Sequence, residues 1–555
     1  MLAASTFEPD SWQFTPEQLR DRLAEFLPKQ SLFAEKTAAI EAALLSPMGQ
    51  SLRGAMAQWI VDQLVPVERL VPAAYERWQL PVRDSMMFVV ERLSAARLAP
   101  KLVEQFELSQ KASAEDRLLL LIAKVPGLQK LGQVIARNQH LRPALRKALA
   151  RLENGIRDVT IAEIRALIEI ELGSRLQKYE VKIASSILSE ASVSAVVRFT
   201  WQDPETGERK RGVFKVLKPH IPEYFAEDME YLQGLAQYFG DRHHRYGFPA
   251  HLIPDTFRKV KRLLQHEVNF RREQKTLQET AVLYRDLPGV RVPDVIPFLC
   301  TPVVTALTEE HGIKVTNAAS RLPATGRRRI AAQLIEALVA VPLLAGQKEA
   351  VFHGDPHAGN LLYDRHTGKL VIIDWALRER LSREQRRHLA LLFLMVSVRD
   401  PIGLANEVLA LTSPRIRTGS RKAQDVLAVV QGFLDQLPVK YLPSGADAMK
   451  LLEKVAIQGV RFPTALIMLS KVMFTLDGLL ADVSGDNSGM GLSIARNVAQ
   501  HWVTHRTGFR SPLKVSDWIT LQCSALLYPT RLWLNYEQKL VDRHFPVQAV
   551  GAGDA

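Results

Sequence analysis

The amino-acid sequence predicts an α+β protein with two lobes, in which a small β-rich lobe precedes a larger helical lobe. Two β-branched and aromatic runs, "SVSAVVRFTW" and "GVFKVLK", are separated by the turn-rich stretch "QDPETGERKR", as in a β-hairpin. Helical periodicity dominates before this region and again past Gly312. The second helical region is interrupted by "VFHGDPHAGNLLYDRHTGKLVIIDW", residues 351–375, which has the pattern of another hairpin.

Composition restricts the classes of protein to consider. The chain has 555 residues, 47% of them hydrophobic and 24% charged, which predicts an ordinary globular protein of several domains. A net charge of +13 favours anionic partners, but the basic groups lack interleaved aromatics, so nucleic acid is an unlikely partner. Cys300 and Cys523 form neither a disulfide framework nor a metal-binding spacing. Without a signal-like start or a long apolar run, we expect a soluble, cytoplasmic protein.

Five regions are expected along the chain. The first is a helical N-terminal region, and the second is a helical extension that leads into the β-rich lobe. The helical lobe with the acidic loops comes next, followed by a C-terminal helical region. Their expected bounds are 1–115, 116–176, 177–312, 313–410 and 411–555. Within the β-rich lobe, we expect one long amphipathic helix at about 255–283, and two further strands in "GVRVPDVIPFLCTPVVTALT".

The segment 351–375 carries the residues of a phosphoryl-transfer site. With "LLY" and "KLVIID" as paired strands, Asp355 and Asn360 occupy the preceding loop and Asp374 ends the second strand, so all three converge at one edge. Kinase-type transfer needs an aspartate beside the acceptor, and an amide and a carboxylate that hold Mg²⁺. His353 completes the H-x-D-x-x-x-x-N spacing. We therefore expect ATP or ADP with Mg²⁺; the alternative is a polar loop whose Asp and Asn serve turns.

The β-rich lobe supplies the charges that should complement this loop. "VFKVLK" places Lys215 in a strand, as in the V-A-I-K motif. Glu267 and Glu273 lie six residues apart on the expected long helix, so they face directions about 120° apart and cannot both meet Lys215. We assign Glu273 to Lys215, although either charge alone is most often a surface residue. The order of these parts is that of a protein kinase, yet no G-x-G-x-x-G precedes the hairpin.

From about residue 120 to about 485, the sequence resembles the UbiB/AarF-type atypical kinases, kinase-like proteins linked to coenzyme Q and other isoprenoid lipids. "KLGQ" (130–133) resembles the family's K-x-G-Q motif, and "SEASVSAV" (189–196) resembles the alanine-rich loop that replaces the glycine-rich loop. "EVNFRRE", "HGDPHAGN" and "LDGLLADVSGD" resemble the E-x-D region, the catalytic loop and the tail of the domain.

The resemblance implies an ATPase or small-molecule kinase active in ubiquinone-type metabolism, and not a conventional protein kinase. It implies that the K-x-G-Q helix packs over the active site, with Lys130 paired to Glu267 and Gln133 in the same regulatory element. It also implies nucleotide contacts from the alanine-rich loop, at Ala191, Ser192 and Ser194. Glu190 and several serines dilute the alanine-rich loop, and two further positions depart from the family pattern. Asn269 replaces the aspartate of E-x-D, and Ala376 of "DWA" replaces a glycine that could adopt positive φ.

Two other functions remain open at this point. Aminoglycoside- and choline-kinase-type phosphotransferases also show "HGD.H.GN" and "IDW", although "KLGQ" favours the UbiB type. A pseudokinase scaffold would explain the altered motifs, whereas the intact Lys215, Asp355, Asn360 and Asp374 argue against it. The phosphoryl acceptor, a lipid or isoprenoid small molecule by resemblance, is not identified by any residue pattern.

The C-terminal segment "DWITLQCSALLYPTRLWLNYEQKL" (517–540) carries Trp518, Tyr528, Trp533 and Tyr536 among leucines. Such aromatics are favoured at membrane interfaces, and the net charge of +13 would add attraction to anionic lipid. The sequence thus predicts peripheral contact with anionic membranes. The alternative, which is the commoner role of such residues, is that they pack the C-terminal helices onto the body of the protein.

Overall fold

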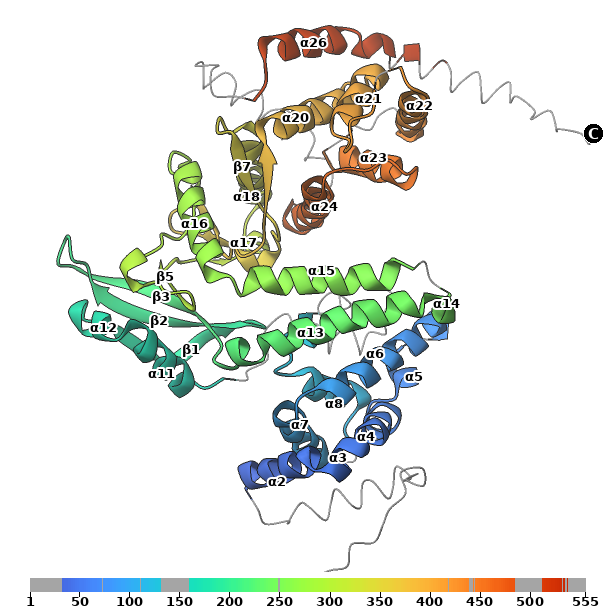
Figure 1. Ribbon diagram of the computed structural model, residues 1–555. Helices are drawn as coiled ribbons and strands as arrows, with labels where there is room; N and C mark the ends of the chain where they lie inside the picture. Colours follow the sequence, from blue (N-terminus) through green and yellow to red (C-terminus); the bar gives the residue numbers. More distant parts are fainter. Residues whose placement is uncertain are drawn as a thin grey trace, which may run out of the picture. The chain divides into compact units, whose positions relative to one another are not determined.

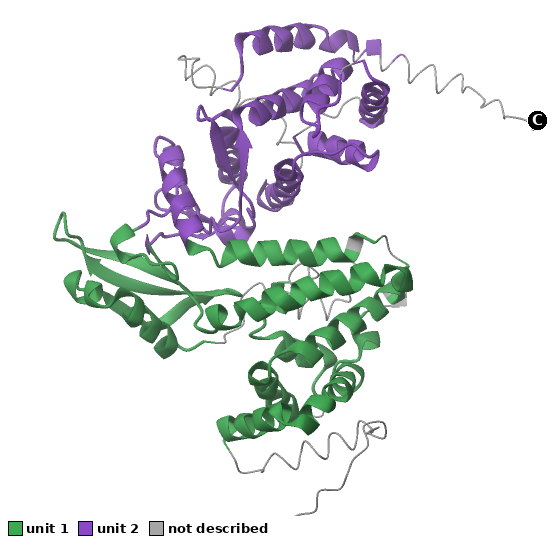
Figure 2. Cartoon of the chain, in the orientation of Figure 1, with its two compact units in different colours: residues 1–270, 296–306 green, residues 271–295, 307–555 purple. Residues whose placement is uncertain are grey.

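The computed structural model (Figure 1) describes residues 32–130, 159–484 and 512–537, except 72, 110, 248–249, 418, 439–442, 444, 532 and 535–536. The chain forms two compact units (Figure 2). Unit 1 comprises residues 1–270 and 296–306, and unit 2 comprises residues 271–295 and 307–555. The finer division into five regions stays a prediction.

Unit 1 contains a helical subregion whose core is built from its longest helices. Phe88, Leu98, Leu232, Leu235 and Leu264 are buried together in this core. They come from α6, α7, α13 and α15, and α13 and α15 lie side by side in Figure 1. The helices of this subregion are α2 (Phe33–Leu45), α3 (Pro47–Ser51), α4 (Arg53–Trp59), α5 (Val67–Leu70), α6 (Gln79–Arg92), α7 (Ala95–Glu107), α8 (Ala114–Ile122), α13 (His220–Asp241), α14 (His243–Tyr246) and α15 (Leu252–Glu267), with a π-helix at Ile60–Leu64 and a 3₁₀ helix at Ala73–Trp78.

A four-stranded sheet forms the remainder of unit 1, with the order β1-β2-β3-β5. Its strands are β1 (Lys182–Glu190), β2 (Ser194–Gln202), β3 (Arg209–Leu217) and β5 (Val304–Thr308). The predicted hairpin is confirmed: β2 and β3 are antiparallel, and Val196 pairs with Lys215. Helices α11 (Ile161–Leu172) and α12 (Ser174–Lys178) precede the sheet. Ile164 and Ile168, one turn apart on α11, share a buried core with Phe199 of β2.

The single helix expected at about 255–283 is wrong, because the structure has two helices there. α15 ends at Glu267 and α16 (Phe270–Tyr284) begins three residues later. Asn269 directly precedes α16, and asparagine is among the residues preferred at that position, where it competes with continuation of a helix. Glu267 is therefore the last residue of one helix and Glu273 belongs to the first turn of another. The expectation that Glu267 and Glu273 point from two faces of a single helix is therefore wrong.

Unit 2 holds the second predicted hairpin. β8 (Leu361–Asp364) and β9 (Lys369–Ile372) are antiparallel, and Leu361 pairs with Ile372, which confirms the hairpin. This pair belongs to the sheet β4-β9-β8-β6, with β4 (Val290–Arg291) and β6 (Ile313–Lys314). β7 (Glu349–His353) pairs separately with β10 (Arg378–Ser382). The two further strands predicted between 290 and 308 are β4 and β5, which belong to different sheets.

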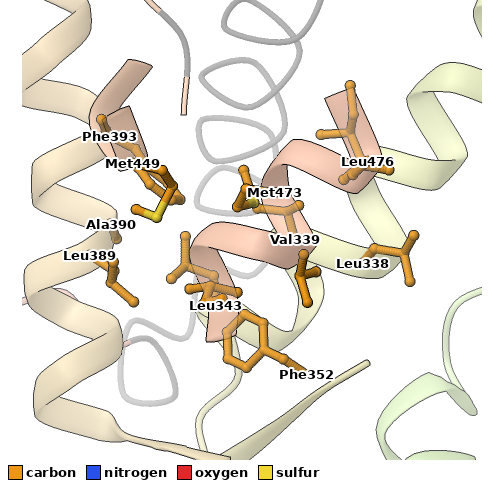
Figure 3. Close-up of a cluster of buried hydrophobic side chains, with 14 of the residues drawn as sticks. Leu338, Val339, Leu343, Phe352, Leu389, Ala390, Phe393, Met449, Met473 and Leu476 are labelled. Atoms are coloured by element: carbon orange, nitrogen blue, oxygen red, sulfur yellow. The ribbon is translucent and has the colours of Figure 1, made fainter. Parts of the chain in front are cut away.

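A large apolar core fills unit 2 (Figure 3). Leu343, Phe352, Leu389, Met449 and Leu476 meet there from five different elements, all of them at most 1% exposed. The helices of this unit after α16 are α17 (Val315–Ala319), α18 (Ala324–Ile335), α19 (Val341–Leu344), α20 (Arg383–Ser397), α21 (Pro401–Ala410), α22 (Arg421–Gln436), α23 (Gly445–Ile457), α24 (Thr464–Ser484) and α26 (Val515–Leu526), with a π-helix at Glu336–Ala340.

Among the described residues, α24 alone is long and apolar enough to cross a membrane. The length of α24 differs from the expectation that the sequence contains no long apolar run. In the structure, nine residues of α24 are buried, and it packs against α17, α18 and α23. These contacts are what is expected of a core helix, and they account for its apolar composition.

Candidate active site

The catalytic loop begins where β7 ends, at His353, and runs to a 3₁₀ turn at Ala358–Asn360. Asn360 closes this loop, because its Nδ2 donates a hydrogen bond to the carbonyl oxygen of Asp355 at 3.1 Å. The backbone N–H of Asn360 also donates to the carbonyl of His357, at 2.9 Å. Asn360 is buried, whereas the Asp355 side chain keeps 14% of its surface exposed. The loop therefore fixes its asparagine and leaves its aspartate partly accessible.

Asp374 follows the second strand of the hairpin, on the same end as Asn360. The N–H of Ile373 donates to the carbonyl of Asn360 at 2.9 Å, which extends the β8–β9 ladder by one more pair. Asn360 and Asp374 are therefore brought to one edge, as predicted from the sequence. Asp374 is exposed and has a φ of +58°, a conformation that aspartate tolerates better than most residues. Beyond it, Trp375 is fully buried in the core of unit 2.

The replacement of the usual glycine by Ala376 is compatible with this backbone. Among the described residues with positive φ, the structure has Asp374 but not Ala376. The Ala376 N–H instead points back to Oδ1 of Asp374, at 3.4 Å. The residue that needs positive φ is thus Asp374, and alanine is sterically acceptable at position 376.

His353 connects the catalytic loop to the strand that carries Asp374. Its Nδ1 accepts a hydrogen bond from the Asp355 N–H at 3.2 Å, and its Nε2 lies 3.2 Å from the carbonyl oxygen of Ile373. These partners require a neutral ring with the proton on Nε2. Burial lowers the pKa of His353, which favours the same neutral form. The H-x-D-x-x-x-x-N spacing indicates the position of His353 in the loop but does not indicate this connecting role.

Gly354 is required by a close approach of two backbones. A Cβ atom at this position would lie 2.8 Å from the carbonyl carbon of Leu377. The Gly354 N–H donates to the Leu377 carbonyl at 2.9 Å, so the loop is held directly against the start of β10. The H-G-D sequence thus combines a connecting histidine, a contact that only glycine allows, and the candidate catalytic aspartate.

Unit 1 carries the residues predicted to contact nucleotide. The loop between β1 and β2 is a tight turn, in which the Ala191 N–H donates to the Ser194 carbonyl at 2.8 Å. Ser192 and Ser194 are buried, and Ala191 is exposed. Lys215 lies on β3, with its Nζ 5.6 Å from the ring centre of Phe270. The strand position predicted for Lys215 is therefore confirmed, while nucleotide contact by these residues stays a prediction.

The predicted partner of Lys130 is present in the structure. Nζ of Lys130 forms an ion pair with Oε1 of Glu267, and each side chain is only 12% exposed. The second oxygen of Glu267 lies 3.5 Å from the hydroxyl of Ser192, which donates to it. One carboxylate therefore joins the end of α15 both to Lys130 and to the β1–β2 loop. Gln133, the last residue of the K-x-G-Q motif, lies outside the described residues.

Glu273 is 2% exposed and lies in the first turn of α16, in unit 2. Lys215 lies in unit 1, so the pairing of Lys215 with Glu273 stays a prediction. The structure thus describes two half-sites. One contains Asp355, Asn360 and Asp374, and the other contains the β1–β2 loop with Lys215.

Comparison with known proteins agrees with this arrangement. Residues 151–407 match the ABC1 atypical kinase-like domain. The chain is 26% identical to the Arabidopsis thaliana "Protein ACTIVITY OF BC1 COMPLEX KINASE 7, chloroplastic", over 64% of this chain and 50% of that one. It is 25% identical to the "Probable protein kinase UbiB" of Sodalis glossinidius, over 62% of this chain and 59% of that one. It is also 23% identical to an uncharacterized Synechocystis protein, over 74% and 69% of the two chains.

These matches define the chain as an atypical kinase-like protein. More particularly, its domain at residues 151–407 is of the ABC1 type and its relatives include UbiB proteins, in agreement with the UbiB/AarF-type family that its motifs predicted. The chain spans between about half and about seven-tenths of the length of these relatives. A solved structure of the Rv3197–erythromycin complex from Mycobacterium tuberculosis aligns with a TM-score of 0.43 at 18% identity, covering 64% of this chain and 87% of that one.

Proposed function

We propose that this protein binds an adenine nucleotide with Mg²⁺ and transfers the terminal phosphoryl group to a small molecule or to water. The observation that supports this most directly is the edge of the β8–β9 hairpin, where Asn360 ends the loop of Asp355 and pairs with Ile373, the residue before Asp374. By its resemblance to UbiB-type proteins, we place the activity in isoprenoid-lipid metabolism of the ubiquinone type.

The donor atoms at this edge fit Mg²⁺. The hydrogen bond of Asn360 uses its nitrogen, which leaves the amide oxygen as the atom that could bind a cation. Asp374 is exposed and offers carboxylate oxygens. Within the part of the chain that the structure describes, no three His, Cys, Asp or Glu side chains group as a metal site. Mg²⁺ does not need such a group, because it takes one or two protein ligands together with phosphate oxygens and water.

The roles of the remaining residues follow from the chemistry of transfer. Bound Mg²⁺ would neutralise charge that develops on the phosphates. The acceptor oxygen bonds to the terminal phosphorus, the bond from phosphorus to the bridging oxygen breaks, and Asp355 takes the acceptor's proton as the nucleoside diphosphate leaves. Lys215 would contact the remaining phosphates, oriented by Glu273. His353 holds the Asp355 backbone in place through its Nδ1.

The other functions considered from the sequence are less well supported. A phosphotransferase of the aminoglycoside or choline kinase type would not account for the match of residues 151–407 to the ABC1 domain. A pseudokinase would bind nucleotide through the same residues without turnover. We favour catalysis because His353, Asp355, Asn360 and Asp374 keep a connected geometry.

Isothermal titration calorimetry with ADP and Mg²⁺ tests the metal assignment. Wild type should bind more tightly with Mg²⁺ than without it, and Asp374→Asn should lose that gain. Asp286→Asn, which changes an exposed aspartate elsewhere in unit 2, is the matched control and should behave as wild type. Equal affinity of wild type and Asp374→Asn would contradict the assignment. ATP turnover by wild type but not by Asp355→Asn would support catalysis, whereas binding without turnover in wild type would favour the pseudokinase.

We also propose a peripheral contact with anionic membranes through α26. Its Val515, Ile519 and Leu526 are 79%, 58% and 79% exposed, and their spacing puts them on one side of the helix. The aromatic residues noted in the sequence behave differently from one another. Trp518 packs partly against the core, whereas Trp533 is 60% exposed. The apolar face of the helix, more than the full set of aromatics, therefore supports the proposal.

A further inference from the structure

A buried ion pair holds the base of the β1–β2 loop in unit 1. Nζ of Lys218 lies 3.2 Å from Oε2 of Glu190, and the two side chains are only 1% and 5% exposed. Glu190 ends β1, and Lys218 directly follows β3. From the sequence, Glu190 looked like a departure from the alanine-rich loop, and Lys218 had no assigned role. The structure shows that they are partners.

The backbone reinforces the same connection. The Lys218 N–H donates to the carbonyl of Val193 at 2.9 Å, so Lys218 binds the loop through both its main chain and its side chain. At the tip, the hydroxyl of Ser192 lies 3.5 Å from Glu267, the carboxylate that also binds Lys130. The three residues between Glu190 and Ser194 are therefore fixed at the base by Lys218 and at the tip by Glu267.

Such a pair is an inefficient way to gain stability alone. Removing two charges from water has a desolvation cost that their attraction often fails to repay, and apolar residues of similar volume often serve as well. A buried pair does, however, impose a defined geometry on the groups that it joins. The loop sequence Ala-Ser-Val contains no glycine, so it lacks the backbone freedom with which a glycine-rich loop adapts to phosphates. A loop without glycine therefore has to be held in the conformation that binds phosphates before the nucleotide arrives.

We infer that Lys218 and Glu190 are positioning residues that hold the β1–β2 loop in the conformation that receives the nucleotide phosphates. This inference rests on the proposed function, and it deepens that function by naming the residues that hold the loop which replaces the glycine-rich loop. Because the loop is already ordered, nucleotide binding does not have to supply the free energy of ordering it. Breaking the pair therefore weakens nucleotide binding even where the fold is retained.

The test is a double-mutant cycle on nucleotide affinity. Lys218→Met, Glu190→Gln and the double variant are compared with wild type by calorimetry with MgADP, below every melting temperature. Each single variant should raise Kd at least tenfold, which corresponds to about 1.4 kcal/mol. The double variant should raise Kd no more than the single variants do, because one interaction is lost in all three. Lys218→Arg, which keeps the charge, should bind more tightly than Lys218→Met.

The matched control is Lys210→Met, which breaks the Lys210–Asp203 ion pair at the opposite end of the β2–β3 hairpin. It should leave Kd unchanged. A Lys218→Met protein that melts earlier but binds MgADP like wild type would show a purely structural pair and overturn the inference. If Lys218→Met does not fold, Glu190→Gln and the double variant are measured instead. Weaker binding of MgADP by these variants supports the inference, and wild-type binding overturns it.

Hydrogen exchange without nucleotide separates this inference from the proposed function. The amides of Ser192, Val193 and Lys218 should exchange faster in Lys218→Met than in wild type, with no such change in Lys210→Met. Equal protection of these amides in wild type and Lys218→Met would overturn the inference, whatever the protein binds. Absence of nucleotide binding by wild type, with faster exchange in Lys218→Met, would instead contradict the proposed function and leave the fixed loop established.

Discussion

Nε2 of His353 lies 3.2 Å from the carbonyl oxygen of Ile373, the residue that precedes Asp374. The other ring nitrogen accepts the Asp355 N–H, so one buried imidazole connects the two carboxylates of the candidate site through their backbones. The ring also packs edge-on against Trp375, with 4.8 Å between the ring centres. A change at His353 should therefore act on both carboxylates together.

We expect His353→Phe to fold but to lose most turnover. Phenylalanine retains the contact with Trp375 and leaves the Asp355 N–H and the Ile373 carbonyl without their partners, at about 1–3 kcal/mol for each unsatisfied group. A small misplacement of a catalytic carboxylate can lower the rate about 100-fold. The measurement is steady-state ATP turnover beside the melting temperature. His366→Phe is the control, because His366 is exposed in the β8–β9 turn, at the opposite end of the hairpin from the catalytic loop. Wild-type turnover in His353→Phe would show that the connection has no part in catalysis.

Ala376→Gly should bring no gain in activity, although it restores the family's glycine. Positive φ occurs at Asp374, and Ala376 is not among the residues that need it. The additional freedom of glycine in the unfolded chain should lower the free energy of unfolding by about 0.5–1 kcal/mol. Urea denaturation and ATP turnover check both expectations. A severalfold rise in turnover would mean that the alanine restricts a motion needed in the catalytic cycle.

Features of this site that depend on residues close together in the sequence were predicted better than features that depend on residues far apart. The β8–β9 hairpin, and with it the position of Asn360 and Asp374 at one edge, follows from local turn chemistry and strand pattern, and it was predicted correctly. The helix break at Asn269 was missed because the apolar pattern continues across it. β1 was also missed, since its exposed and partly buried residues show no regular alternation.

Longer-range contacts could not be derived from local patterns. Lys218 and Glu190 are 28 residues apart in sequence, and only the pairing of three strands brings them together. The pair between Lys130 and Glu267, 137 residues apart, was predicted from the family resemblance together with two glutamate faces on one long helix, and that helix is in fact α15 and α16. The connecting role of His353 likewise depends on where β9 ends relative to β7.

We predict that Lys130→Ala lowers stability and changes nucleotide affinity. The pair with Glu267 is mostly buried, so removing one partner should cost about 2–4 kcal/mol. The freed Glu267 remains beside Ser192, which should also shift the affinity of the β1–β2 loop for MgADP. Lys36→Ala is the matched control in the same unit, because Glu107, its partner at 2.9 Å, is 48% exposed. Loss of that exposed pair should cost no more than about 1 kcal/mol. Wild-type melting temperature, affinity and turnover in Lys130→Ala would rule out a regulatory role for the Lys130–Glu267 pair.

Stability should fall as the pH drops from about 6.5 towards 4, and His220 should contribute to the loss. Burial, followed by the nearby charges of Lys218, Lys124 and Arg97, lowers the pKa of His220 to about 4. Between this value and the ordinary value of about 6.5, the unfolded chain binds a proton that the folded protein does not, so folding loses free energy as the pH falls. The contribution is fully present above about pH 6.5 and is of the order of 3 kcal/mol.

Urea denaturation of wild type and His220→Phe at pH 7.5 and pH 4.5 measures this contribution. His353 should reduce stability in the same direction on acidification, because its pKa is also lowered by burial, so His220→Phe should remove only part of the loss. His244→Phe is a control for the loss of one histidine at a site where the structure leaves the side chain exposed. A pH dependence that is identical in wild type and His220→Phe would contradict the prediction.

The last prediction concerns α26, whose buried residues are Asp517, Leu521 and Ser524 and whose exposed residues include Val515, Ile519 and Leu526. The guanidinium group of Arg387 on α20 donates two hydrogen bonds to Asp517, one to each carboxylate oxygen. The hydroxyl of Ser524 donates a hydrogen bond to the carboxylate of Asp400. These contacts hold the helix on unit 2, so its exposed side, with Val515, Ile519 and Leu526, is not turned inward.

Vesicles that contain anionic lipid should therefore bind the protein weakly at low salt and release it at high salt, because burial of a short apolar face needs the support of electrostatic attraction. Liposome flotation measures this binding. The double variant Ile519→Glu with Leu526→Glu should abolish it. Ile457→Glu, which adds a charge at a residue 81% exposed on α23, should reduce it only slightly. Failure of wild type to float at low salt would exclude a membrane contact for this face, and flotation that ignores salt would point to insertion by another part of the chain.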